Sequence, residues 1–222
     1  MIKGIIFDMD GVIVDSEPLW EEAATRYLIT IGVKLPTSRK FQHYIDTHIR
    51  GRKWEEVVNN FKKKLGVKQS YQQITRGCLK ELFILFNKEL KTNPGAISLI
   101  KHLCKNGYPI LLASSAPRPS INLIIKKFHL RKYLKHIISG DNVTKGKPHP
   151  EIFLKSAKKL KLKPSQILVI EDSISGVRAA YRAGMKCIAL KQPYTAKKYL
   201  RTADLVVNKL SQISIKKIQE LK

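Results

Sequence analysis

An alternation of short apolar runs with longer amphipathic segments limits the fold of this chain more than any other feature. Most of the runs are rich in β-branched residues and four to six residues long, which suits buried strands of a parallel sheet. In order, they are Gly4–Phe7, Pro109–Ala113, His136–Ser139, Gln166–Ile170, Lys186–Leu190 and Leu205–Val207. Helical patterns between them lie at Ile97–Lys105, Ile121–Phe128, Glu151–Leu160 and Ile174–Ala183. The alternation predicts an α/β fold with a doubly wound, Rossmann-like parallel sheet.

One long interval interrupts this alternation. Between the first two runs no convincing strand is visible, and apolar residues recur at helical spacing. Two such series are Phe41, Ile45 and Ile49, and Ile74, Cys78, Leu82 and Leu85. We therefore expect an all-helical cap, residues 17–91, inserted into a core formed by residues 1–16 and 92–222. The connections at Asp15–Glu17 and Lys91–Gly95 would act as hinges, so that the cap can serve as a lid.

Length and composition are those of an ordinary globular protein. Hydrophobic residues make up 43% of the 222 residues, which is enough for a sizeable core. No apolar run approaches the roughly 18–20 residues of a membrane-spanning helix, and no secretory signal pattern precedes the first strand. We therefore expect a cytoplasmic protein, with a monomer as the default. The cysteines Cys78, Cys104 and Cys187 lack CxxC spacing, which argues against a zinc site or a disulfide framework.

The net charge of +25 is the unusual property of the composition. Such a charge can indicate nucleic-acid binding. Here, however, lysines are scattered from Lys3 to Lys222, and the densest cluster, Lys62–Lys64, lies on a helical pattern whose opposite face is apolar. No basic segment is interleaved with aromatic residues as in single-strand-binding proteins. We read the charge as a compositional bias that would attract anionic substrates, and nucleic-acid binding is the alternative from a different class.

Two aspartates follow the first apolar run. Asp8 and Asp10 are separated by one residue, so in an extended backbone both carboxylates point to the same side. They would lie at the carboxyl end of a strand, where open α/β sheets bind ligands. Because carboxylates this close repel each other, they need a bound cation or a shared proton. The pair indicates a Mg²⁺-assisted phosphoryl-transfer site, with Asp8 as the nucleophile and Asp10 as the general acid and base.

Three further segments place polar residues at the ends of predicted strands or in adjacent loops. Ser114 ends the second run, where it could bind phosphate oxygens or cap the following helix. Lys147, which follows a glycine and precedes a proline, could offset the charge of the nucleophile and the phosphoryl group, whereas Lys145 is read as solvated. Asp172 would complete a Mg²⁺ site with Glu171 acting through water, or both acids would stabilise the dipole of the next helix.

The order of these elements resembles that of the haloacid dehalogenase (HAD) superfamily, in the branch with a helical cap between the first two strands. The matching motifs are FDMDGVIVDSEP at 7–18, LLASSA at 111–116, GKPHPEIF at 146–153 and VIEDSISGVRAA at 169–180. The resemblance implies that Asp8 is phosphorylated, and that Asp10 is the acid and base and offers its backbone carbonyl to Mg²⁺. It also implies that Ser114 and Lys147 hold the phosphoryl group and that Asp172 binds the metal.

Within this family the sequence favours hydrolysis of a phosphate ester. Dehalogenases lack the second aspartate, so Asp10 disfavours dehalogenation. β-Phosphoglucomutases typically carry a histidine where this chain has Trp20, and the form DSEPLW is more similar to that of hexose-phosphate phosphatases. Arg50, Gly51 and Arg52 resemble the substrate loop of the cap, where either arginine could clamp a second anionic group or be solvated. Trp20 could line the pocket or pack the cap helix.

We therefore predict a Mg²⁺-dependent phosphatase that hydrolyses a small phosphorylated metabolite, with sugar phosphates first, through an aspartyl-phosphate. A β-phosphoglucomutase-type mutase is the alternative. The predicted catalytic residues are Asp8, Asp10, Ser114 and Lys147. The candidate metal ligands are Asp8, Asp10, Glu171 and Asp172, and the candidate substrate-binding residues are Trp20, Arg50, Gly51, Arg52, Ser114 and Ser115.

Overall fold

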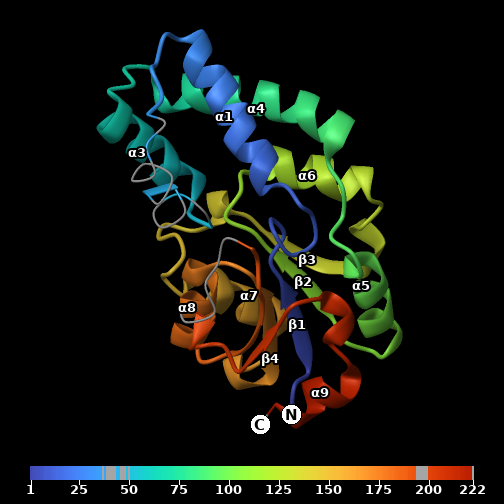
Figure 1. Ribbon diagram of the computed structural model, residues 1–222. Coiled ribbons are helices and arrows are strands. Elements are labelled where there is room, and N and C mark those ends of the chain that lie inside the picture. Colours follow the sequence, from blue (N-terminus) through green and yellow to red (C-terminus); the bar gives the residue numbers. More distant parts are fainter. Residues whose placement is uncertain (37, 39–43, 46–48, 50, 194–199, 222) are drawn as a thin grey trace.

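A parallel sheet of six strands forms the centre of the molecule (Figure 1). The computed structural model describes residues 1–36, 38, 44–45, 49, 51–193 and 200–221. The strands are β1 (Gly4–Phe7), β2 (Ile110–Ala113), β3 (Leu134–Ile138), β4 (Ile167–Glu171), β5 (Lys186–Leu190) and β6 (Leu205–Val207). Their order is β3-β2-β1-β4-β5-β6, and every neighbouring pair is parallel. The predicted doubly wound sheet is confirmed, and each predicted run overlaps one strand.

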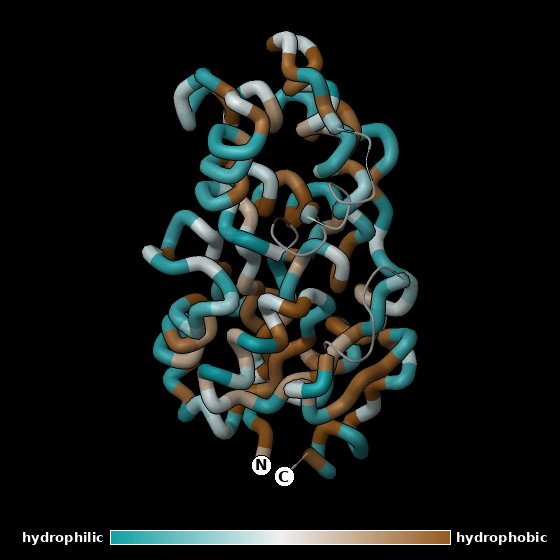
Figure 2. Tube along the Cα trace, turned by 60° about the vertical axis from the view of Figure 1, so that its left-hand side comes forward, coloured by the Kyte–Doolittle hydropathy of each residue, from teal (hydrophilic) through white to brown (hydrophobic). Residues whose placement is uncertain are grey.

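The strands turn alternate side chains to two separate hydrophobic cores. The helices that cover the sheet are α5 (Ala96–Lys105), α6 (Arg118–Lys127), α7 (Glu151–Leu160), α8 (Ile174–Arg182) and α9 (Ile215–Glu220). Ile5 and Phe7 of β1 pack with α5, α6 and α9, whereas Ile6 packs with α7 and α8. Both faces of the sheet are therefore covered, which explains why the central strands read as continuous apolar runs. Figure 2 shows these hydrophobic strands in the interior of the lower part of the molecule.

The segment between β1 and α5 is called the insert here (residues 17–91). Its described residues contain no strand. Its described helices are α1 (Glu17–Thr30), α3 (Trp54–Leu65) and α4 (Tyr71–Glu89), which gather beyond the carboxyl ends of the strands (Figure 1). The apolar series of α4 is buried as predicted, at Ile74, Cys78, Leu82 and Leu85. Most of the series that begins at Phe41, including Phe41 itself, lies outside the described residues. Within the described chain, no helix is long and apolar enough to cross a membrane.

The insert joins the sheet through two chain segments that are hydrogen-bonded to each other. Val14 and Thr92 form an antiparallel bridge. Next to it, the Asp15 N–H donates to the Lys91 carbonyl at 3.1 Å. The insert is thus attached through one short double connection, at the positions where the sequence predicts hinges.

Two elements begin more than one residue before their predicted starts. β3 begins at Leu134 rather than His136, because an edge strand can include an exposed polar residue such as Lys135. α6 begins at Arg118 rather than Ile121, since a proline is accommodated in the first turn of a helix, where its missing N–H has no partner to lose.

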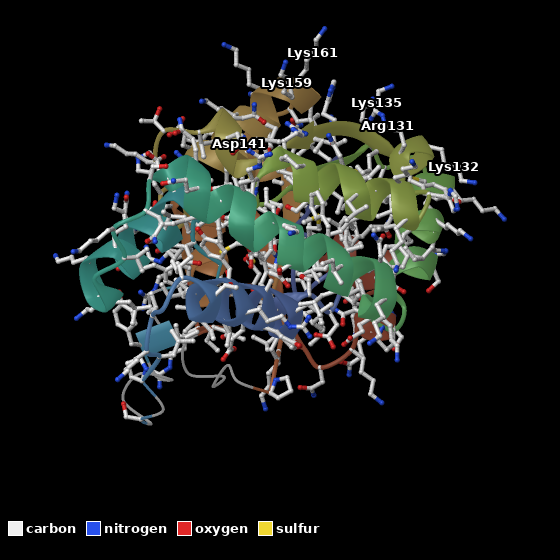
Figure 3. The ribbon with its side chains drawn as sticks, turned by 90° about the horizontal axis from the view of Figure 1, so that it is seen from above. Arg131, Lys132, Lys135, Asp141, Lys159 and Lys161 are labelled. Carbon is white, nitrogen blue, oxygen red and sulfur yellow. The ribbon has the colours of Figure 1, made fainter. Side chains whose placement is uncertain are left out.

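The positive charge lies on the outside of the molecule. Figure 3 shows five exposed cations that point outward along one side, namely Arg131, Lys132, Lys135, Lys159 and Lys161. Exposed charge on the edge strand β3 disfavours pairing with a second sheet. Among the described lysines and arginines, only Lys147 is buried.

Candidate active site

The predicted site residues of the core gather at the carboxyl ends of three neighbouring strands. Asp8 follows β1, Ser114 follows β2, and Glu171 ends β4 with Asp172 directly after it. Because these strands are adjacent and parallel, their carboxyl ends open at the same edge of the sheet. Lys147 reaches the same point from the loop before α7.

Lys147 is the centre of a buried ion-pair network. Its Nζ lies 2.7 Å from Asp8 Oδ1 and 2.5 Å from Glu171 Oε1, and its side chain is 1% exposed. Burial lowers the pKa of Lys147, but the two carboxylates outweigh burial and raise it. Burial also raises the pKa of Asp8 well above its usual range, and the lysine opposes this shift. Such buried charges are tolerated only when they are paired and hydrogen-bonded.

Three buried carboxylates form a cluster suited to a metal ion. Asp8, Glu171 and Asp172 each place one oxygen within 4.8 Å of the others. Burial, followed by the charges of Glu171 and Asp8, raises the pKa of Asp172. A Cβ on Gly11 would collide with the Asp172 carboxylate, so this glycine lets the backbone of the first loop approach the cluster. Three acids facing one lysine leave an excess of negative charge, and their hard oxygen ligands fit Mg²⁺.

Glu171 is held from several directions. Its Oε2 accepts hydrogen bonds from the Asp172 N–H at 2.8 Å and from the Ser173 N–H and hydroxyl at 2.9 and 3.0 Å. Its Oε1 accepts from Lys147. Glu171 thereby orients both the lysine and the loop that carries Asp172, an arrangement that suits an indirect role.

Asp10 lies outside this cluster and has partners of its own. Its Oδ1 accepts hydrogen bonds from Ser16 Oγ at 2.6 Å and from Trp20 Nε1 at 3.1 Å. Its Oδ2 accepts from Ser114 Oγ at 3.2 Å. Burial raises the pKa of Asp10, and the three hydrogen bonds oppose this shift.

The two aspartates lie between the end of β1 and the turn at Gly11. β1 ends at Phe7, and the chain turns at Gly11, whose φ of 77° is in the left-handed region. The Asp8 carboxylate bonds to Lys147. The Asp10 carboxylate bonds instead to Ser16, to Trp20 of the insert and to Ser114 after β2. Both aspartates line one cavity between the sheet and the insert, although their carboxylates bond to different partners.

Three polar residues that fix this first loop are missed by the sequence analysis. Ser16 holds Asp10 as described above, and Asn93 Nδ2 donates to the Gly11 carbonyl at 2.7 Å. Gln192 Nε2 donates to the same carbonyl at 2.5 Å. Asn93 lies in the predicted hinge Lys91–Gly95, without a role of its own in the prediction. No local pattern marks Gln192, because its partner is far away in the sequence.

The two serines after β2 face different partners. Ser114 is buried, donates to Asp10 and accepts from the Ala116 N–H at 3.1 Å. The N-cap of α6 is Pro117, so the alternative that Ser114 caps this helix is wrong. Ser115 Oγ donates to the Gly51 carbonyl at 3.1 Å, which connects the loop after β2 to the insert.

Gly51 and Arg52 bring the insert onto the core. The Gly51 carbonyl also accepts from Ser175 Oγ at 3.3 Å, and its φ of 69° favours glycine. Arg52 Nη1 donates to the Lys147 carbonyl at 3.3 Å. Its Nε is buried and has no hydrogen-bond partner among the described residues. Arg50 lies outside the described residues.

A cavity of about 240 Å³ opens over these groups, between the sheet and the insert. At the core end it is lined by the polar residues Asp8, Asp10, Lys147 and Asp172. The insert lines it largely with apolar residues, among them Trp20, Trp54, Val57 and Phe61. Trp20 therefore both lines the cavity and packs within the insert, its ring centroid 5.2 Å from that of Trp54.

The chain is similar to known proteins over most of its length. A model of the haloacid dehalogenase-like hydrolase family matches residues 5–190. The chain is 32% identical over 187 residues to a phosphorylated carbohydrates phosphatase of Thermotoga maritima, covering 84% of each chain. It is 28% identical over 194 residues to hexitol phosphatase B of Escherichia coli strain K12, covering 86% of this chain and 85% of the relative. A crystal structure of β-phosphoglucomutase from Clostridium difficile matches with a TM-score of 0.82 and 27% identity, covering 100% and 97% of the two chains.

The chain belongs to the haloacid dehalogenase-like hydrolase family, in the β-phosphoglucomutase-like branch that its motifs indicate. Within that family it is an enzyme of the phosphoric monoester hydrolase class, the class to which the names of its curated relatives point.

Proposed function

We propose that this chain is a Mg²⁺-dependent phosphatase that hydrolyses a small phosphorylated metabolite through an aspartyl-phosphate on Asp8. Phosphorylated carbohydrates are the proposed substrate class. The observation that carries the proposal is the buried arrangement of Asp8, Lys147 and Asp172 below a cavity of small-molecule size. The curated relatives are named for phosphorylated carbohydrates and for hexitols, which supports the substrate class. A cytoplasmic location stays a prediction from the sequence.

Asp8 is placed to be the nucleophile. Lys147 fixes its Oδ1, so we assign the attack to Oδ2. A bond forms between this oxygen and the phosphorus, while the bond from the phosphorus to the leaving oxygen breaks. The ammonium group of Lys147 stabilises the negative charge that the carboxylate and the phosphoryl group bring together.

Asp10 is placed to move the protons of both half-reactions. It donates a proton to the leaving oxygen as the aspartyl-phosphate forms. It then takes a proton from the water that attacks this intermediate, which regenerates Asp8 and releases phosphate. Burial raises the pKa of Asp10, which favours the protonated form that the first step needs.

The acidic cluster supplies the ligands for the metal. Asp8, Asp172 and the backbone carbonyl of Asp10 would hold Mg²⁺, with Glu171 acting through water or through the loop that it orients. When bound, the ion neutralises the excess negative charge of the cluster and of the phosphoryl oxygens.

The insert is proposed to act as a cap, residues 17–91, over a core of residues 1–16 and 92–222. The hydrogen bonds of Ser115 and Ser175 to Gly51 support this proposal, because they seat the insert beside the site. A cap held against the core in this way excludes bulk water from the site while the aspartyl-phosphate exists.

The first experiment is a screen of the purified protein against a panel of phosphate monoesters, with Mg²⁺ and with a chelator. We expect phosphate release that depends on Mg²⁺ and is fastest with phosphorylated carbohydrates. Isomer formation from β-glucose 1-phosphate with a bisphosphate primer, without phosphate release, would favour the mutase instead. Salt-dependent duplex binding without any phosphatase activity would favour the nucleic-acid alternative.

The second experiment is Asp8→Asn, which keeps the shape of the side chain but removes the nucleophile. We expect turnover and the mass increase of a phosphorylated protein to be lost, while the circular dichroism spectrum stays the same. Asp141→Asn, at an exposed aspartate of the core, is the matched control. Full activity in Asp8→Asn refutes the nucleophile assignment.

A further inference from the structure

We propose that Trp20 is a positioning residue that holds Oδ1 of Asp10, so that Oδ2 is the oxygen that passes protons to and from the substrate. The proposal rests on the role of Asp10 proposed above. It goes beyond that role because it assigns different tasks to the two oxygens and makes an aromatic side chain of the insert part of the catalytic geometry.

The three donors to Asp10 are not equivalent. Ser16 and Ser114 donate through hydroxyl groups, which can rotate and can accept a hydrogen bond instead. Trp20 donates through an indole N–H, which cannot accept and has one direction. Oδ1 is therefore fixed as an acceptor whatever the state of the serines. Among the described residues, Oδ2 has a single donor, the Ser114 hydroxyl at 3.2 Å, which can reverse its role.

The indole ring is held in place by other aromatic rings. Its centroid lies 5.2 Å from that of Trp54 and 6.2 Å from that of Phe86, the second contact being edge-to-face. Trp54 packs in turn edge-to-face against Phe61, with 6.5 Å between the ring centroids. Residues of α1, α3 and α4 thus set the direction of the N–H that Asp10 receives.

The two tryptophans of this pair differ in what their N–H groups serve. The Trp54 N–H binds a threonine within the insert, which is a contact between two helices. The Trp20 N–H donates across to the core, to the carboxylate of Asp10 in the loop after β1. Packing alone would need the Trp20 ring but not this N–H, so ring and N–H can be tested separately.

The test compares Trp20→Phe, which keeps the ring packing and removes the donor, with Trp20→His, which restores an N–H. For each, kcat/KM is measured with two esters, an alkyl phosphate hydrolysed by the wild type and p-nitrophenyl phosphate. The alkoxide leaving group needs a proton from Asp10, whereas p-nitrophenolate leaves without one. Thr75→Val is the control, because it removes the hydrogen bond of the other indole.

We expect Trp20→Phe to lower kcat/KM for the alkyl ester about 10–100-fold, the size of one hydrogen bond to a charged group. For the same variant we expect kcat/KM with p-nitrophenyl phosphate to stay within about threefold of the wild-type value. Trp20→His should recover part of the loss with the alkyl ester, and Thr75→Val should match the wild type with both esters. An equal loss on both esters, or no loss on either, overturns the positioning role while leaving the phosphatase intact. If the wild type hydrolyses no phosphate ester of the panel, no alkyl ester can be chosen and the proposed function itself is overturned.

Discussion

The core end and the insert side of the cavity are built from different interactions. At the core end, Asp8, Glu171 and Lys147 are buried and bonded to one another. On the insert side, aromatic and aliphatic side chains dominate, and the polar Arg52 has a buried Nε without a partner among the described residues. Charges in the first region depend on one another, whereas residues in the second contribute more independently.

This difference indicates how the two regions divide the reaction. A buried charge network keeps its geometry only as a whole, because removal of one member leaves the others unpaired. It suits the steps that every phosphate ester shares. Apolar walls can change residue by residue without leaving unpaired charge, so they suit the choice of the leaving group. Two results would contradict this division. One is a substitution in the charge network that leaves the stability and kcat unchanged, and the other is a substitution on the insert side that lowers kcat as strongly as one in the network.

The largest effect is expected from Lys147→Met. Loss of the cation leaves Asp8 and Glu171 buried without their common partner, at a cost of about 3–5 kcal/mol in the free energy of unfolding. We expect kcat to fall by about 10²–10³-fold, since the phosphoryl charge is no longer offset. Urea unfolding and steady-state kinetics measure the two effects.

Lys145→Met is the matched control, since this lysine is two residues away and exposed. It should change neither the urea midpoint nor kcat. Raising the Mg²⁺ concentration should return part of the lost stability to Lys147→Met, because the ion supplies positive charge to the same cluster. If Lys147→Met unfolded like the wild type, the carboxylates would not depend on the lysine, and the contrast between the two regions would fail.

The core end was the more predictable region, for a physical reason. β1, β2 and β4 are buried at every residue, so their sequences show uninterrupted apolar runs whose ends are easy to place. Topology then brings Asp8, Ser114 and Asp172 together, because carboxyl ends of adjacent parallel strands share one edge.

What the sequence could not provide are contacts that need three-dimensional packing. Helical periodicity predicted the buried face of α4, but not that the Trp20 indole would reach Asp10 from α1. It also could not show that Gly51 accepts hydrogen bonds from Ser115 and Ser175, since these partners are far apart in the chain. Period and propensity act within one element, whereas these bonds depend on how elements sit together.

An intermediate effect is expected from Arg52→Lys, on the insert side. The lysine keeps the positive charge but lacks the buried Nε–H and the planar fork of the guanidinium. We expect KM for the best ester of the panel to rise about tenfold, the size of one lost hydrogen bond to a charged group, with kcat within about threefold. Arg26→Lys, at an exposed arginine of α1, is the control.

This result would sharpen the comparison, because a change confined to KM means that the insert residue binds the substrate without taking part in the chemistry. A fall in kcat equal to that of Lys147→Met would contradict the division between the two regions.

The smallest effect is expected from Glu151→Gln, which supports the loop that carries Lys147. The pKa of Glu151 is lowered from 4.5 to about 2 by the hydrogen bond from Lys155 and by the backbone N–H groups of Lys145 and Thr144. A carboxyl group whose pKa is lowered by folding stabilises the protein above its unfolded value and loses this contribution as the pH falls. Glu151→Gln should therefore lower the free energy of unfolding by about 1 kcal/mol at pH 7, with kcat nearly unchanged.

The pH dependence makes this prediction specific to the core end. The difference between wild type and Glu151→Gln in urea unfolding should be constant above about pH 4.5 and shrink below it, towards pH 2. Glu89→Gln on α4 of the insert is the matched comparison, because Glu89 is exposed and its pairing with Lys88 is long, at 3.9 Å. It should cost no more than about 0.3 kcal/mol at any pH, as isolated surface pairs do. If the two variants lowered the free energy of unfolding equally, or if the Glu151 difference grew as the pH fell, the Glu151 carboxylate would not stabilise the loop around Lys147. The position of that loop would then depend on packing alone.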